Sequence, residues 1–521
     1  MNGQPSCANE WLLKDVLRDA WAFDGYVTSD CDAEGDGAMR SKYPNASIAV
    51  AAILRAGTDV DCGSFMAKNA RAALQDGTVT EEDFNVVLRR QFRLRLRLGM
   101  FDPPGVLQTI GIDQVCTPAS FELARDGVRQ SVVLAKNTGG LLPLSAAAFS
   151  GALVLGPLAN VTGQGTVTYY GSVPCPNMSW SPLDAIAQHI PSATALLGVP
   201  SVGSNDTSGI AAAAAAAASA PLVVLAIGSD LSLEREGHDR LVTNFSDAQL
   251  ALIAAVTAAA QGRPVVALVF SGGAMDISPL LQNPGIAGIL LCGQPSVQVV
   301  GAGDVLFGRT LDGRAVAPAG RMSQMTYPAN FVDQVSMFDF GMRPGPSAWP
   351  PGTNPGRTYR FYTGTPVLPF GFGLSYTTWM YTPLPDPAPP ALAQLQAAAA
   401  LAAAGPLGSV PPALKAEAAQ FWVNVTNTGT VDSDEVVLGF LVPPGAGVNG
   451  VPLQELFGFE RVHVPAGQTV TVYLGAQGVR FTQADREGKR HALGGLYKVR
   501  FGVQETAGQG MGFAELPLMV V

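Results

Sequence analysis

The stretch F-D-G-Y-V-T-S-D-C-D, from Phe23 to Asp32, decides how the sequence is interpreted. Asp24-Gly25 is a turn signal, and the β-prone run that follows ends at Ser29-Asp30. A short buried strand with a carboxylate at its C-terminal tip is how parallel α/β folds build active sites. Asp30 is therefore a candidate catalytic residue. Taken alone, the pattern also fits an aspartate that forms a turn or caps the next helix.

The flanking residues alternate between helical and strand patterns. We expect helices at 9–23, 48–56 and 65–74, a second strand at 58–61, and a helix that begins after the N-cap Thr80. In the first helix an apolar stripe should face the core, with charged residues opposite; the stripe is Leu12, Leu13, Val16, Leu17, Ala20 and Trp21. This order indicates part of a βα array that is too short for a whole barrel of about 250 residues.

A second α/β array follows a break at Asp102-Pro103-Pro104-Gly105. We expect a helix over 120–136, strands at 152–155, 195–197, 222–227, 265–270 and 286–291, and helices between them. Such alternation predicts a mostly parallel sheet covered on both faces. Residues 383–419 are rich in Pro and Ala and predict a linker or long loop. Short strands at 421–426, 435–441, 469–474 and 497–503 then predict a small β-sandwich.

Composition and charge bound the function. At 521 residues, with 47% hydrophobic and 14% charged residues, the chain should form two to four globular domains. A net charge of −9 argues against a nucleic-acid partner. The one basic run, Arg89 to Arg97, is interpreted as a solvated helix face. The most apolar stretch is alanine-rich and broken by Pro221, so no membrane partner is expected.

The six cysteines form no C-x-x-C pair, which disfavours a zinc site. Cys31 and Cys62 each follow a strand-like run, so adjacent parallel strands could bring them together as a disulfide; buried free thiols are the alternative. Six N-x-S/T triplets suggest a secreted glycoprotein, extracellular or in the cell wall, whose leader is not in this chain; they start at Asn45, Asn160, Asn177, Asn205, Asn244 and Asn424.

Several motifs in this order resemble the plant and fungal β-xylosidase branch of glycoside hydrolase family 3. They include N-G-Q-P-S-C-A-N-E-W-L-L (2–13), G-Y-V-T-S-D-C-D-A (25–33), A-G-T-D-V-D-C-G (56–63) and P-F-G-F-G-L-S-Y-T (369–377). The resemblance covers nearly the whole chain. It implies the end of a (β/α)8-type barrel over 1–105, a linker at 106–118 and an α/β sandwich over 119–380. A Pro/Ala-rich linker at 381–419 and a fibronectin type III-like domain over 420–521 would complete the chain.

The resemblance implies a retaining glycosidase, in which two carboxyl groups about 5–5.5 Å apart divide the work. Asp30 matches the family's nucleophile, whereas Asp32 should point away or cap the loop. The acid/base would come from S-L-E-R-E-G-H-D-R, residues 232–240, as Glu234 with Glu236 the runner-up. The acid/base needs a raised pKa, and an apolar crevice near another carboxylate would provide it. A solvated, charge-rich loop is the alternative, and His238 is interpreted as a loop histidine. No cofactor and no metal are implied.

The resemblance also bears on the substrate. Cys31 stands where the β-glucosidase branch usually has Trp. Cys at this position is similar to enzymes that act on β-D-xylosides and α-L-arabinofuranosides of xylan and arabinoxylan. By comparison with the family the chain begins inside the barrel, so the truncated chain is expected to be impaired. The alternatives are a non-catalytic carbohydrate-binding or structural remnant, and a β-glucosidase of the same family.

Overall fold

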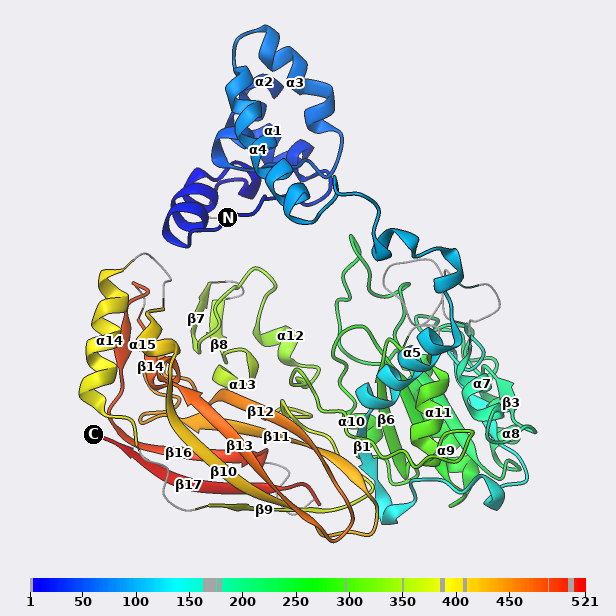
Figure 1. The fold of residues 1–521 in the computed structure, drawn as a ribbon. Coiled ribbons are helices and arrows are strands. Elements are labelled where there is room, and N and C mark those ends of the chain that lie inside the picture. Colours follow the sequence, from blue (N-terminus) through cyan, green and yellow to red (C-terminus); the bar gives the residue numbers. More distant parts are fainter. Residues whose placement is uncertain are drawn as a thin grey trace. The chain divides into compact units, whose positions relative to one another are not determined.

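A computed structural model describes residues 3–162, 175, 180–295, 298–348, 351–384, 389–405, 410–485, 487–504 and 510–521. Within these residues no helix is both long and apolar enough to cross a membrane. The chain divides into two compact units. Unit one comprises Met1–Gly111, Gln394–Lys415 and Ala484–Ala492, and unit two comprises Ile112–Ala393, Ala416–Gln483 and Leu493–Val521 (Figure 1).

The N-terminal part of unit one is a small helical array around one strand pairing. Its helices are η2 (Trp11–Ala20, a π-helix), α1 (Gly37–Lys42), α2 (Ala46–Ala56), α3 (Phe65–Gln75) and α4 (Glu81–Arg97). The two predicted strands pair in parallel through a single bridge between Thr28 and Val60. Thr80 caps α4, as the sequence predicts, and it also forms a capping box with Asp83. In η2 the predicted stripe is buried only at Leu13 and Val16, and Trp21 is exposed.

One buried carboxylate fixes that strand pairing. Asp59, whose side chain is fully buried, accepts hydrogen bonds from Arg18 Nη2 at 2.6 Å and Arg90 Nη1 at 3.0 Å. It also accepts the backbone N–H of Val27 at 2.8 Å. The interpretation of the basic run as a solvated face is therefore wrong for Arg90, although Arg89, Arg93 and Arg97 do make exposed pairs. The local period of the helix gave no sign of a buried partner 31 residues away.

The α/β domain of unit two is built on a six-stranded sheet in the order β1-β6-β5-β4-β2-β3. Its strands are β1 (Val133–Asn137), β2 (Leu153–Leu155), β3 (Thr194–Leu196), β4 (Val223–Gly228), β5 (Val265–Phe270) and β6 (Gly288–Gly293). All pairings are parallel except that of β1 with β6. Every residue of β4 and β5 is buried, as expected for a sheet covered on both faces.

Helices cover both faces of this sheet (Figure 1). One apolar cluster joins the sheet to α8 (Ile210–Ala217) and α9 (Asp247–Ala260). The other joins it to α5 (Pro118–Ser131), α7 (Pro182–Ala187) and α11 (Val300–Phe307). The short helices α10 (Ser278–Leu281), α12 (Phe331–Gln334) and α13 (Thr358–Phe361) and the hairpin β7 (Gly345–Ala348) and β8 (Pro351–Asn354) complete the domain.

Two sequence expectations in these regions are wrong. The helix predicted over 120–136 ends at Ser131, and Val133–Asn137 is the edge strand β1. Its β-branched and apolar start pairs with β6, so tertiary pairing outweighs the helical pattern. The predicted loop at 383–419 contains α14 (Leu392–Ala404) and α15 (Pro412–Lys415). Alanine has the highest helix propensity, and Leu395, Ala398 and Ala399 of α14 are buried.

The C-terminal domain is a β-sandwich of two antiparallel sheets. One sheet has the order β13-β10-β9 and the other β12-β11-β16-β17. The strands are β9 (Trp379–Pro383), β10 (Glu417–Asn427), β11 (Ser433–Val442), β12 (Glu455–Val464), β13 (Thr469–Gln477), β16 (Gly495–Gly502) and β17 (Phe513–Val520), with a small β14 (Thr482–Ala484) and β15 (Arg490–Ala492) pair. The sequence analysis did not predict β9, β12 or β17. Phe421 of β10 packs on Phe457 and Phe501 between the sheets.

A buried carboxylate on α11 ties that helix to α5 and to the turn that follows α7. Asp304 is fully buried and accepts hydrogen bonds from Arg125 and Arg129 of α5, and His189 lies 3.3 Å away. Burial opposes its ionisation, but the hydrogen bonds from His189, Arg125 and Arg129 outweigh burial and lower the pKa of Asp304 to about 2.

Replacing Asp304 by Ala should therefore lower the free energy of unfolding by roughly 3–5 kcal/mol, because two arginines lose their buried counter-charge. The exposed pair Asp312–Arg314 provides the control, and Asp312→Ala should destabilise the protein far less, because solvent screens an exposed ion pair. A lowered pKa gives stability that is present above the unfolded value near 4 and is lost as the pH falls toward 2. Urea unfolding from pH 2 to pH 7 measures both effects, and equal losses in the two variants would contradict the assignment.

Candidate active site

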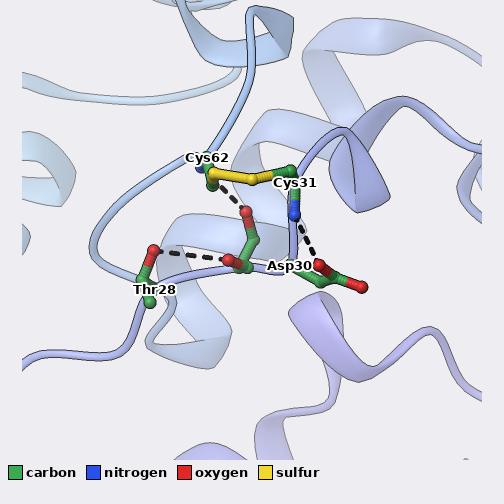
Figure 2. Close-up of a disulfide and its surroundings, with 5 residues drawn as sticks. Thr28, Asp30, Cys31 and Cys62 are labelled. Carbon is green, nitrogen blue, oxygen red and sulfur yellow. Dashed lines mark hydrogen bonds between the residues drawn. A yellow bond between two sulfur atoms is a disulfide. The ribbon is translucent and has the colours of Figure 1, made fainter. Parts of the chain in front are cut away.

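The loop after Thr28 presents Asp30 at the end of the strand pair. Ser29 N–H donates to Val60 O at 2.8 Å, and Cys62 N–H donates to Ser29 Oγ at 3.0 Å. Cys31 and Cys62 form a disulfide that joins the two loops, so the pairing that the sequence left open is present (Figure 2). A second disulfide, Cys116–Cys175, was not anticipated. Asp30 is thus held on a cross-linked strand end, in the position where parallel α/β folds place reacting groups.

The Asp30 carboxylate is exposed and only lightly held. Its Oδ1 accepts the N–H of Cys31 at 2.8 Å, and the other oxygen points away from the loop (Figure 2). Within the described residues no donor reaches that second oxygen. Asp30 lines a cavity of about 670 Å³ in unit one; Leu13, Val27, Thr28 and Thr58 are among its other walls. Asp32 does not line this cavity, and it sits instead at a turn with a φ of 60° before the short helix 33–35.

Sequence reasoning missed one residue of this loop, Glu34. Its side chain is fully buried, and neither carboxyl oxygen has a hydrogen-bond partner within the described residues. Burial, with a smaller contribution from the charge of Asp61, raises the pKa of Glu34 to about 7. The sequence D-A-E-G gives no indication that Glu34 is buried, because the burial of an acid in this loop depends on packing that no local pattern encodes.

Glu34 should make the stability of unit one depend on pH. The folded state keeps a proton that the unfolded chain releases above about pH 4.5, so the free energy of unfolding should fall as the pH rises from about 4.5 to about 7. Glu34→Gln should remove this slope and raise the melting temperature at pH 7.5. Thermal melts of both proteins from pH 4 to pH 8 measure it, with Glu10→Gln on the exposed Lys14 pair as control. Parallel wild-type and Glu34→Gln curves would refute the assignment.

In unit two, Glu234 stands on the loop that follows β4. Ser229 Oγ donates to Glu234 Oε1 at 2.6 Å, and the backbone N–H groups of Gly272 and Gly273 lie 3.2 and 3.3 Å from the same oxygen. Arg240 Nε lies 3.5 Å from Oε2. The sequence led us to expect an apolar crevice, and the structure shows a polar cradle instead. The cradle holds the carboxylate in one orientation.

The two glycines permit this close approach. A Cβ atom at Gly273 would lie 3.1 Å from Glu234 Oε2, and one at Gly272 would lie 2.8 Å from the Gln294 amide. Gly272 follows β5 and Gln294 follows β6, so three adjacent parallel strands end at this point. Ligands of open α/β sheets bind at that edge of the sheet.

Glu234 also lines a cavity of about 620 Å³; its walls include His238, Arg240, Thr243, Gln294 and Met337. Two buried polar atoms in this wall, Arg240 Nη1 and Thr243 Oγ1, have no hydrogen-bond partner within the described residues. Glu236 is exposed and does not line the cavity. The backbones of Arg235 and His238 pair with each other in a tight turn, which directs Glu234 and Glu236 to different surroundings.

The fold and the two cavities define a multidomain α/β protein whose acidic groups lie at the carboxyl ends of parallel strands. Models of the glycosyl hydrolase family 3 N-terminal and C-terminal domains match residues 1–94 and 132–376, and a fibronectin type III-like model matches 435–504. The chain belongs to glycoside hydrolase family 3.

Relatives place the chain within that family. It is 35% identical over 518 residues to Beta-D-xylosidase 1 of Arabidopsis thaliana, covering 96% of this chain and 64% of that one. It is 34% identical to Beta-xylosidase/alpha-L-arabinofuranosidase 2 of Medicago sativa subsp. varia, covering 89% and 58%. A solved GH3 exo-beta-xylosidase (XlnD), in complex with a xylobiose aziridine activity-based probe, superimposes with a TM-score of 0.84 at 29% identity and covers 100% and 64%. The chain thus spans less than two thirds of the length of these relatives.

Proposed function

We propose that this protein is a retaining exo-glycosidase that removes terminal β-D-xylosyl residues from xylan-type oligosaccharides. The observation that carries the proposal is Asp30, a lightly held carboxylate at the tip of a strand, beside a cavity. The relatives named as β-xylosidases support the xylosyl preference, and the Medicago relative supports α-L-arabinofuranosyl residues as a second substrate.

In the proposed reaction Asp30 attacks the anomeric carbon, and the glycosidic C–O bond breaks as an ester forms between Asp30 and the sugar. Glu234 gives its proton to the leaving oxygen. In the second half, Glu234 takes a proton from water, the water oxygen attacks the same carbon, and the Asp30 carboxylate is released. The configuration at the anomeric carbon is inverted twice and so retained.

The wall around Glu234 supports a polar substrate on that side. Arg240 Nη1 and Thr243 Oγ1 are buried and unpartnered within the described residues, which is costly unless a ligand satisfies them. Sugar hydroxyls both donate and accept, so they can pair with a guanidinium N–H and with a threonine hydroxyl.

We further propose that the protein is secreted. Two disulfides support an oxidising compartment. Of the sequon asparagines, Asn45, Asn160, Asn205 and Asn244 are exposed, whereas Asn424 is half-buried and Asn177 lies outside the described residues. A loss of mass on treatment with an N-glycan-cleaving enzyme would test the proposal in protein from its native source.

The catalytic assignment predicts a clear contrast between neighbouring acids. Asp30→Ala should lower kcat for nitrophenyl β-xyloside by at least about a thousandfold, and Asp32→Asn should lower it by less than about tenfold, because Asp30 lines the cavity and Asp32 does not. Glu234→Ala should slow xylobiose far more than a dinitrophenyl xyloside, whose leaving group needs no proton. Added azide should restore the rate of this variant, with xylosyl azide as the product. Glu236→Gln serves as its control.

Release of nitrophenol or dinitrophenol measures the rates on the aryl xylosides, and release of xylose measures the rate on xylobiose. Full activity in Asp30→Ala would contradict the nucleophile assignment. Binding of xylo-oligosaccharides without turnover in the wild type would favour the non-catalytic alternative, and faster release from the glucoside would favour a β-glucosidase.

A further inference from the structure

The outer face of one sheet of the C-terminal sandwich carries two exposed aromatic rings side by side. Trp422 of β10 and Tyr473 of β13 are cross-strand partners, with ring centroids 5.4 Å apart. Their exposed fractions are 40% and 42%. A buried core does not account for this pair, because the inward residues of the same strand, Phe421, Val423 and Val425, are the ones that pack between the sheets.

Polar side chains that can bond hydroxyl groups surround the two rings. Asn424 and Thr426 follow Trp422 on the same face, opposite Thr471 and Thr469 of β13. Thr471 Oγ1 donates to Asn424 Oδ1 at 2.7 Å, and the hydroxyls of Thr426 and Thr469 lie 2.8 Å apart. At the other end Gln420 donates to Glu417 at 2.6 Å. Tyr473 also forms a side-chain hydrogen bond with Glu417. Gly475 lies beside this pair and has no side chain to obstruct it.

The face is almost free of charge. Among the outward residues of β9, β10 and β13, Glu417 alone carries a formal charge. The other sheet differs, because Lys498 and Arg500 of β16 pair there with Glu515 of β17. In a chain of net charge −9, a neutral face with amides, hydroxyls and aromatic rings is unsuited to a charged partner.

These features match the chemistry of a neutral polysaccharide. The C–H face of a sugar ring is apolar and can stack on an aromatic ring, while its hydroxyls bond the flanking amides and hydroxyls. The strand from Gln420 to Thr426 advances roughly 20 Å, which is long enough for several sugar units in a row.

We propose that the outer face of the β13-β10-β9 sheet, centred on Trp422 and Tyr473, binds a neutral polysaccharide chain and holds the protein on its substrate. The choice of xylan as that chain rests on the proposed function; the binding face does not. The face would act by raising the local concentration of chain ends rather than by touching the reacting bond.

The test measures binding and hydrolysis separately on the full chain, produced in a host that adds no N-glycans. Trp422→Ala and Tyr473→Ala should each weaken retention in native gels containing soluble xylan by roughly five- to tenfold, and the double variant should lose it. Phe459→Ala is the matched control, because Phe459 is an aromatic of β12 in the other sheet and is 65% exposed. All variants should keep the wild-type kcat/KM on nitrophenyl xyloside and the wild-type melting temperature.

Three results would overturn the proposal: no retention of the wild type by xylan, unchanged retention of Trp422→Ala, or an equal loss in Phe459→Ala. Asn424 heads an N-x-T sequon on this face, so its own glycan is a competing occupant. Protein from a glycosylating host tests this occupant. If that protein carries a glycan at Asn424 and binds xylan only after Asn424→Gln, the glycan is what covers the face, and the proposal is wrong. If sedimentation shows a dimer of the wild type that dissociates in Trp422→Ala, the face binds a second copy of the chain instead of a polysaccharide. If the wild type does not hydrolyse nitrophenyl xyloside but is retained by xylan, the proposed function is wrong and the binding face stands.

Discussion

The buried carboxylate of Asp59 is the interaction on which the N-terminal unit depends. It receives two guanidinium groups and one backbone N–H, and it draws donors from η2, from α4 and from the first strand. A buried charge of this kind is stable only while its partners remain in place, so it fixes where those elements meet. Because Val27 and Asp59 are locked together, the residues that follow each of them, Asp30 and Cys62, also have fixed places.

The second unit reaches the same end by different means. There a buried sheet sets the direction of the loops, and Asp304 holds the helices of one face against it. Glu234 is then fixed by the hydroxyl of Ser229 and by two glycine N–H groups at the ends of neighbouring strands. In both units the reactive candidate lies on a loop at a strand end, and that loop is held by residues that would not themselves react. Precise placement of reacting groups requires such support.

The features that the sequence could predict are those with a local or periodic signal. Buried strands such as Val265–Phe270, the cap at Thr80 and the strand that leads to Asp30 belong to this class. The resemblance of whole motifs to the family, rather than periodicity, indicated the roles of Asp30 and Glu234. Features set by contacts between distant residues were missed: the partner of Arg90, the burial of Glu34 and the strand at Val133–Asn137. The Ala-rich segment carries two conflicting local signals, low complexity and high helix propensity, and α14 shows that helix propensity prevails there with Leu395, Ala398 and Ala399 buried.

Covalent labelling tests the central claim, that the Asp30 carboxylate is the nucleophile. An aziridine of xylobiose configuration reacts with an attacking carboxylate by opening of its strained ring, leaving an ester to the sugar and a free amine. After incubation, peptide mass spectrometry should find one adduct, on the peptide that contains Asp30, and prior incubation with xylobiose should slow its formation. An adduct on Asp32 or Glu234 instead, or a folded protein that takes up no label, would contradict the account.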